Sequence, residues 1–221
     1  MKTFLRRLVS LTWGLLLYSL GIALTLNAQI GYAPWDTFHV GLANTLQISI
    51  GTSSIGVGLV IMTITIVLKE KVGLGSIMNM FAIGLFLDVI LLVLPRATSL
   101  VSGILMLVAG LLVISFATYF YIASGFGAGP RDSLMVALTR KSGLPIGLCR
   151  VVIEGLALFC GWRLGGMVGL GTILSALLAG VFVQFTFQLL RFDATGVQHE
   201  TLLDTFYYLK ELRSPKRKGR M

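Results

Sequence analysis

Long apolar runs alternate with short polar segments along the whole chain, and the runs approach the length that spans a bilayer. A transmembrane helix needs about 20 mostly apolar residues. Six runs are assigned as spans: residues 8–26, 53–68, 74–94, 100–123, 146–162 and 170–190. The second and fifth runs are short and polar at their starts, which predicts tilted or partly buried helices. The pattern predicts an all-α membrane protein with six transmembrane helices.

The sequence repeats itself at a fixed shift. GYAPWD at residues 31–36 returns as GAGPRD at residues 127–132, a shift of 96 (127 minus 31). Held without a gap from residue 30 to residue 91, this shift matches 15 of 62 pairs identically, including a VGLG turn that recurs at 168–171. We therefore expect two copies of one unit, residues 1–98 and 99–190, followed by a C-terminal segment of residues 191–221.

Each copy contains a short extra segment after its first apolar run, opened by the motif Gly-x-x-Pro-x-Asp. The residues that start these segments are Gly31 and Pro34 in the first copy and Gly127 and Pro130 in the second. Proline suits the first helical turn, and Asp36 and Asp132 then lie at the positive end of the helix dipole. The motif predicts a short helix in each copy, either lying at the membrane interface or entering the protein as a re-entrant half-helix.

The distribution of basic residues predicts an inverted arrangement. Three spans per copy is an odd number, so the second copy must enter the membrane from the opposite side. With the N-terminus inside, the cytoplasmic segments hold Lys2, Arg6, Arg7, Lys69, Lys71, Arg131, Arg140, Lys141 and Arg191. The exterior holds only Arg96 and Arg163, as the positive-inside rule requires. Both termini are expected in the cytoplasm, and the copies are expected to form a 3+3 inverted repeat about an axis in the membrane plane.

Composition agrees with a membrane protein and removes nucleic acid from the expected partners. Hydrophobic residues make up 56% of the chain and charged residues 12%, with a mean hydropathy of +0.89. The net charge of +9 comes from residues at the ends of apolar runs and in the tail, so it orients the protein.

The N-terminal run imitates a signal peptide. Because the 96-residue shift pairs Leu11 with Leu107 and Gly14 with Gly110, we expect this run to be retained.

The C-terminal segment predicts an amphipathic helix over residues 200–212. Basic residues follow it at Arg213, Lys216, Arg217, Lys218 and Arg220. An interfacial helix with a basic end would meet anionic lipid head groups. A solvated tail with no role beyond topology is the open alternative.

The chain resembles the YczE/YyaS/YitT group of bacterial integral membrane proteins, closest to the YczE type. The resemblance covers residues 5 to 190 and rests on IGYAPWDTF, GFGAGPRDSL and the two VGLG-x-I turns. It implies a multi-pass protein of the bacterial cytoplasmic membrane. It implies no activity.

Polar groups at membrane depth are the best candidates for function, because they are costly there and usually face an interior or a cavity. The topology places Asp88 in the outer leaflet with Asp36 and His39. Its repeat partner Gln184 falls in the inner leaflet, where the other polar candidates are Asp132, Arg131 and Arg150. Capping and dipole compensation would explain Asp36 and Asp132 equally well.

Arg150 and Glu154 are four residues apart and share one helix face, so we expect them to interact. They are either a structural ion pair or a binding or gating pair. The first copy has Ser54 and Gly58 at these positions, so the pair belongs to one repeat only.

Two functions of different class fit the sequence. The first is a small secondary transporter of an unidentified solute, coupled to protons or cations, because inverted repeats with discontinuous helices are common in transporters. The second is a non-transporting accessory protein that supports another complex. We expect no enzyme activity, cofactor or metal site, since the chain lacks a His-rich constellation and a GxSxG nucleophile.

Reporter fusions test the predicted topology. Fusions after Lys71 and after Lys141 should read cytoplasmic, and a fusion after Arg96 should read external, because positive charge is retained on the cytoplasmic side. A cytoplasmic signal at Arg96 would remove the odd span count and with it the inverted repeat.

Overall fold

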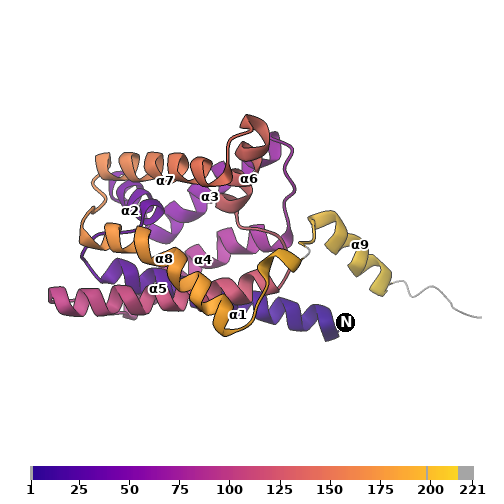
Figure 1. The fold of residues 1–221 in the computed structure, drawn as a ribbon, viewed down its shortest axis with the longest axis horizontal. Helices are drawn as coiled ribbons and strands as arrows, with labels where there is room; N and C mark the ends of the chain where they lie inside the picture. Colours follow the sequence, from indigo (N-terminus) through magenta and orange to yellow (C-terminus); the bar gives the residue numbers. More distant parts are fainter. Residues whose placement is uncertain (1, 198, 214–221) are drawn as a thin grey trace, which may run out of the picture.

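The computed structural model of the protein describes residues 2–197 and 199–213, and it folds these ranges into nine α-helices without a strand (Figure 1). The helices are α1 Lys2–Asn27, α2 Pro34–Leu46, α3 Ile50–Val67, α4 Leu74–Val93, α5 Leu100–Ala123, α6 Pro130–Ser142, α7 Ile146–Arg163, α8 Leu170–Leu189 and α9 Leu202–Arg213. The prediction of an all-α protein is confirmed. Both short helices begin at the proline of the repeated motif, as predicted.

Five helices are long and apolar enough to cross a membrane, namely α1, α3, α4, α5 and α8. The sixth predicted span forms α7, which is 18 residues long, as is α3. Helix α7 differs in carrying three charged residues, Arg150, Glu154 and Arg163. Its charge content, and not its length, separates it from the other five.

The second half of the chain repeats the backbone of the first half. Helices α6, α7 and α8 each begin and end 96 residues after α2, α3 and α4, and α5 ends 96 residues after α1. The same shift relates residues with positive φ: Gln29 and Gly125, Gly31 and Gly127, Gln47 and Gly143, Lys69 and Gly165. Positive φ is unusual for residues other than glycine, so this agreement shows that the turns as well as the helices repeat.

The two halves are joined by a reciprocal pair of backbone hydrogen bonds. The Gly171 amide donates to the Ile30 carbonyl at 2.7 Å, and the Gly75 amide donates to the Phe126 carbonyl at 2.7 Å. The 96-residue shift converts one bond into the other, since 30 becomes 126 and 75 becomes 171. An exchange in which each partner makes the same contact to the other is the sign of two-fold symmetry.

Glycine permits the close approach at these junctions. Gly31 and Gly127 have φ values of +110° and +109°, a region that L side chains rarely adopt. A Cβ on Gly31 would also lie 2.6 Å from the Gly169 amide nitrogen, and one on Gly127 would lie 2.9 Å from the Gly73 Cα. The Gly-x-x-Pro-x-Asp motif of each half therefore packs against the VGLG turn of the other half.

Helices α1 and α5 make the most extensive helix–helix contact and pack antiparallel along the lower edge of the bundle in Figure 1. Their contacts pair rising positions on α1 with falling positions on α5: Arg7 with Ser124, Gly21 with Gly110, and Gly103 with Ala28. Small residues let the backbones approach, as in other membrane helix pairs. Helix α4 packs on α1, and α8 packs on α5, so the last helix of each half packs on the first helix of the same half.

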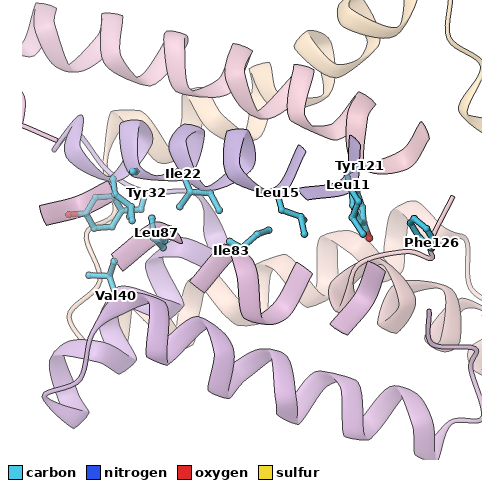
Figure 2. Close-up of a cluster of buried hydrophobic side chains, with 11 residues drawn as sticks. Leu11, Leu15, Ile22, Tyr32, Val40, Ile83, Leu87, Tyr121 and Phe126 are labelled. Atoms are coloured by element: carbon cyan, nitrogen blue, oxygen red, sulfur yellow. The ribbon is translucent and has the colours of Figure 1, made fainter. Parts of the chain in front are cut away.

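The main buried cluster lies between α1 and α4. Figure 2 shows Leu15 and Ile22 of α1 beside Ile83 and Leu87 of α4, with Phe126 near the junction at the other end. Leu15 and Phe126 are fully buried. This packing fixes α4 against α1.

The C-terminal segment is attached to one end of the bundle. The Arg7 guanidinium pairs with the Glu200 carboxylate and lies 4.5 Å from the centre of the Phe126 ring. The Glu200 amide donates to the Gly125 carbonyl at 2.8 Å, and the Leu202 amide donates to the Val72 carbonyl at 3.1 Å.

Helix α9 is the predicted amphipathic helix, displaced by two residues at its start. Its first turn is capped by Thr201 and Asp204, which exchange hydrogen bonds. The hydrogen bonds that Thr201 donates to the Asp204 carboxylate hold the pKa of that group below its usual value. The predicted basic residues Lys216, Arg217, Lys218 and Arg220 lie outside the described residues.

Replacing Gly171 by alanine should weaken the junction. A Cβ there would lie 2.4 Å from the Gly31 carbonyl oxygen, so the backbone must shift. We expect a loss of about 1–3 kcal/mol in unfolding free energy, measured by thermal unfolding in mild detergent.

Gly155→Ala is the matched control for this change. Apart from its chain neighbours and the nearby backbone of α7, no atom lies within 4 Å of the Cβ position at Gly155. Alanine should leave stability unchanged or raise it by up to about 1 kcal/mol, because glycine is a poor helix former. Equal stability of the Gly171 variant and wild type would contradict the importance of the junction.

Candidate functional site

A cavity of about 430 Å³ lies at the centre of the bundle, between the helices of both halves. It is bounded by parts of α1, α3, α4, α5 and α8 and by the start of α6, and it receives one residue each from α2 and α7. Its ionisable lining consists of His39, Arg131, Asp132 and Arg150, together with two tyrosines. A cavity of this size suits a small organic solute.

The two short helices meet at this cavity. The Arg131 guanidinium carbon lies 4.9 Å from the centre of the Trp35 ring, in a cation-π contact. The 96-residue shift pairs Trp35 with Arg131, so two equivalent positions touch each other, and such contacts occur only near a two-fold axis. Nη2 of Arg131 also lies 3.4 Å from each ring nitrogen of His39. The site is therefore built where the pseudo-symmetry axis passes.

The two motif aspartates have different surroundings. Asp36 is 7% exposed and does not line the cavity, whereas Asp132 is exposed to it. The described residues include no ion pair within 4 Å for either carboxylate or for Arg131. Sequence symmetry made the two aspartates equivalent, but the structure gives only Asp132 access to the cavity.

Arg150 and Glu154 form the ion pair that their spacing predicted, with 2.8 Å between Arg150 Nε and Glu154 Oε1. Arg150 lines the cavity, and its side chain is 59% exposed, against 31% for Glu154. The pair is thus placed at the edge of the cavity on α7.

Asp88 holds the start of α3 to the end of α4. Its carboxylate accepts hydrogen bonds from the Gly51 amide at 2.8 Å and from the Ser49 hydroxyl. It lines a separate cavity with Arg96 and does not face the one that contains His39. The predicted grouping of Asp88 with Asp36 and His39 is therefore not formed in the structure, because Asp88 is used at the contact between α3 and α4.

The two repeats differ most at this contact. Gly51 and Gly84 are buried against each other, and a Cβ on Gly84 would lie 2.7 Å from the Gly51 carbonyl oxygen. Their repeat partners Gly147 and Gly180 are exposed, with no atom within 4 Å of either Cβ position. Helix α3 packs along α4, whereas the fully described helices α7 and α8 form no comparable contact.

A second, outer pocket lies against α8 next to the central cavity. Gly180 and Val183 line the central cavity and also a wide outer pocket. Gln184, the repeat partner of Asp88, is exposed in that outer pocket. Asp88 thus ties α3 to α4 at one end of the bundle, whereas its equivalent Gln184 is exposed at the other end.

Sequence reasoning missed the neutral polar lining of the cavity. Tyr18, Asn79 and Tyr121 lie within apolar runs and carry no charge, so they did not stand out. In the part of the chain that the structure describes, no three His, Cys, Asp or Glu side chains gather as metal ligands would.

Comparisons with known proteins find relatives of the same kind. The sequence profile of a family described as "Family of unknown function (DUF6198)" matches residues 5–188. The uncharacterized membrane protein YczE of Bacillus subtilis (strain 168) is 34% identical over 175 residues, which cover 78% of this chain and 81% of YczE. An uncharacterized protein of Haemophilus influenzae (strain ATCC 51907 / DSM 11121 / KW20 / Rd) is 35% identical over 175 residues, 79% of this chain and 80% of the relative.

The uncharacterized protein YyaS of Bacillus subtilis is 27% identical over 174 residues, 77% of this chain and 87% of YyaS. The resemblance to YczE and YyaS seen in the motifs is confirmed. No solved structure matches the fold significantly.

Asp88 and Gln184 offer a matched test of the asymmetry. Asp88→Ala removes the acceptor for Gly51 and Ser49 and should lower the unfolding free energy by about 1–3 kcal/mol. Gln184→Ala changes an exposed side chain and should stay within about 0.5 kcal/mol of wild type. Thermal unfolding of both variants in detergent measures the difference, and equal losses would show that the two ends are alike.

Proposed function

Because the chain belongs to the DUF6198 family, whose function is unknown, we propose from its own geometry that it is a small secondary transporter. The observation that carries this proposal is one central cavity beside which α3 and α4 are packed together while the equivalent helices α7 and α8 are not. A transporter with two related halves needs such a difference, since only one half can be open at a time.

The proposed architecture is a 3+3 inverted repeat with six spans, α1, α3 and α4 in one half and α5, α7 and α8 in the other. The matching helix bounds and the reciprocal hydrogen bonds support a two-fold relation. The antiparallel packing of α1 and α5 supports inversion, because the first helix of each half then crosses the membrane in opposite directions. Helix α7 serves as the sixth span, with Arg150 of its ion pair on the cavity lining.

The proposed cycle exchanges the two gates. Closing the open end would bring Gly147 and Gly180 together, as Gly51 and Gly84 are together now. Opening the other end would release Asp88 from Ser49 and Gly51. Both glycine pairs lack a side chain that would hinder the approach, so neither gate needs a change of fold.

The orientation follows from the basic residues. With the N-terminus in the cytoplasm of a bacterial cell, the start of α3 and the end of α4 lie outside, and the start of α7 and the end of α8 lie inside. The structure then represents an inward-facing state. The cavity wall next to α6 would face the cytoplasm, and the basic tail would meet anionic lipid at the same surface.

The charges around the cavity favour a cation as the solute or the coupling ion. Arg150 and Glu154 neutralise each other. Asp132 is the one carboxylate on the cavity lining, and in the described structure no ion pair within 4 Å holds it. An unpaired carboxylate inside a membrane protein is costly and is relieved by binding a cation or a proton.

A disulfide between the two open glycines tests the gate. In a variant with Cys149 and Cys160 replaced by alanine, Gly147→Cys with Gly180→Cys should cross-link on oxidation when α7 and α8 close. Each single cysteine variant should give no cross-link within one chain. No cross-link under any condition would contradict the closing of this gate.

Proteoliposomes loaded with a bacterial metabolite extract test transport itself. At least one solute should move across vesicles that contain the reduced protein, and its movement should stop on cross-linking and return on reduction. Vesicles without protein provide the background. If no solute moves faster than this background, the accessory role replaces the transporter.

A further inference from the structure

We propose that the pocket at the start of α6 binds the primary ammonium group of a small organic cation. This inference rests on the proposed transport function and names its substrate class. The carboxylate of Asp132, the amide oxygen of Asn79 and the phenol oxygen of Tyr121 form the pocket.

Three oxygen atoms converge on one point beside Gly129. The position that a Cβ of Gly129 would occupy lies 3.4 Å from Tyr121 Oη, 3.6 Å from Asn79 Oδ1 and 3.6 Å from Asp132 Oδ2. A primary ammonium group carries three N–H donors. Its three donors match the three acceptor oxygens in number, which is true of neither a quaternary ammonium nor a carboxylate.

The phenol of Tyr121 supplies independent support for a ligand. Its side chain is 5% exposed, and in the described structure its oxygen has no hydrogen-bond partner. A buried hydroxyl without a partner costs stability comparable to a lost hydrogen bond. Tyr121 lines the cavity, and a donor bound beside Gly129 would satisfy its oxygen.

The size and polarity of the space favour an organic cation over a bare metal ion. No three His, Cys, Asp or Glu side chains of the described residues gather there as metal ligands would. The cavity of about 430 Å³ continues from the oxygens past Ile22, Val57 and Ile83. These apolar walls would contact the hydrocarbon part of the ligand.

The other half of the protein does not build this pocket. The 96-residue shift replaces Gly129 by Ala33, Tyr121 by Thr25 and Asn79 by Ser175, and the remaining carboxylate, Asp36, does not line the cavity. A purely architectural feature of the repeat would be expected in both halves. The difference supports a binding role for this one.

Thermal unfolding of the purified protein in detergent, titrated with propylamine hydrochloride near neutral pH, tests the proposal. Propylammonium should raise Tm saturably by about 3 °C or more, since a ligand that binds only the folded state stabilises it. Choline chloride keeps the ionic strength constant and has no N–H donor. Sodium propionate, of similar size and opposite charge, and sodium chloride should give no comparable rise.

Three variants tie the effect to the pocket. Asp132→Asn removes the charge, Tyr121→Phe removes the phenol oxygen, and Gly129→Ala fills the convergence point without changing charge. Gly129 has φ −62° and ψ 161°, which alanine adopts readily, and alanine stands at the equivalent position 33. Each variant should weaken the apparent affinity for propylammonium at least tenfold.

Asp36→Asn is the matched control, because it removes the same charge from the equivalent position outside the cavity. It should keep the apparent affinity within about threefold of wild type. The proposal is overturned if propionate or sodium alone produces the rise, if propylammonium produces none, or if Asp36→Asn and Asp132→Asn lose affinity equally. Binding of propylammonium without any transport in vesicles would refute only the transporter, and transport of a solute without an ammonium group would refute only this pocket.

Discussion

The structure depends on the pair of hydrogen bonds that each half of the chain makes to the other, from Gly171 to Ile30 and from Gly75 to Phe126. Buried backbone groups must be paired, most strictly where no water is available. The turn before each short helix satisfies this need by accepting a hydrogen bond from the first turn of the last helix of the opposite half. As a result, α2 and α6 are held with their starts at the centre of the bundle, and the site lies between them.

The symmetry of the backbone and the asymmetry of the packing have separate consequences. Shared helix bounds and shared positive φ values give the two halves one architecture. Asp88 then closes one end through Ser49 and Gly51, whereas the opposite end has Gln184 exposed in an open pocket. Two packings of the same unit within one chain suggest that each half can adopt either. This interchange is what a population of alternating states requires.

Much of the fold could be predicted from the sequence, because its signals are local. Apolar length gave the long helices, and Gly-x-x-Pro-x-Asp marked the starts of α2 and α6. The spacing of Arg150 and Glu154 predicted their ion pair, since two residues four apart on a helix share a face. That six helices cross the membrane as a 3+3 inverted repeat stays a prediction. That the basic tail contacts the lipid surface also stays a prediction.

The site could be predicted only in part, because its members come from six helices distant in sequence. Asp132, Arg131 and Arg150, which share an expected leaflet, line one cavity, whereas Gln184 of the same expected group lies in a separate outer pocket. Asp88 was placed with His39 by the same reasoning, but leaflet alone does not tell which face of a helix a residue occupies. Tyr121 and Asn79 gave no signal in an apolar run. Their importance comes from the space beside Gly129, which only the packed structure reveals.

Distances measured by pulsed electron paramagnetic resonance across both gates test alternating access most directly. Spin labels at positions 56 and 85 span α3 and α4, and labels at 152 and 181 are the equivalent pair on α7 and α8 (56 plus 96, 85 plus 96). All four positions are exposed, so labels should not disturb the packing. In lipid nanodiscs each pair should show a short and a long distance, and conditions that lengthen one pair should shorten the other. A single fixed distance for each pair, short across α3 and α4 and long across α7 and α8 under every condition, would contradict alternating access.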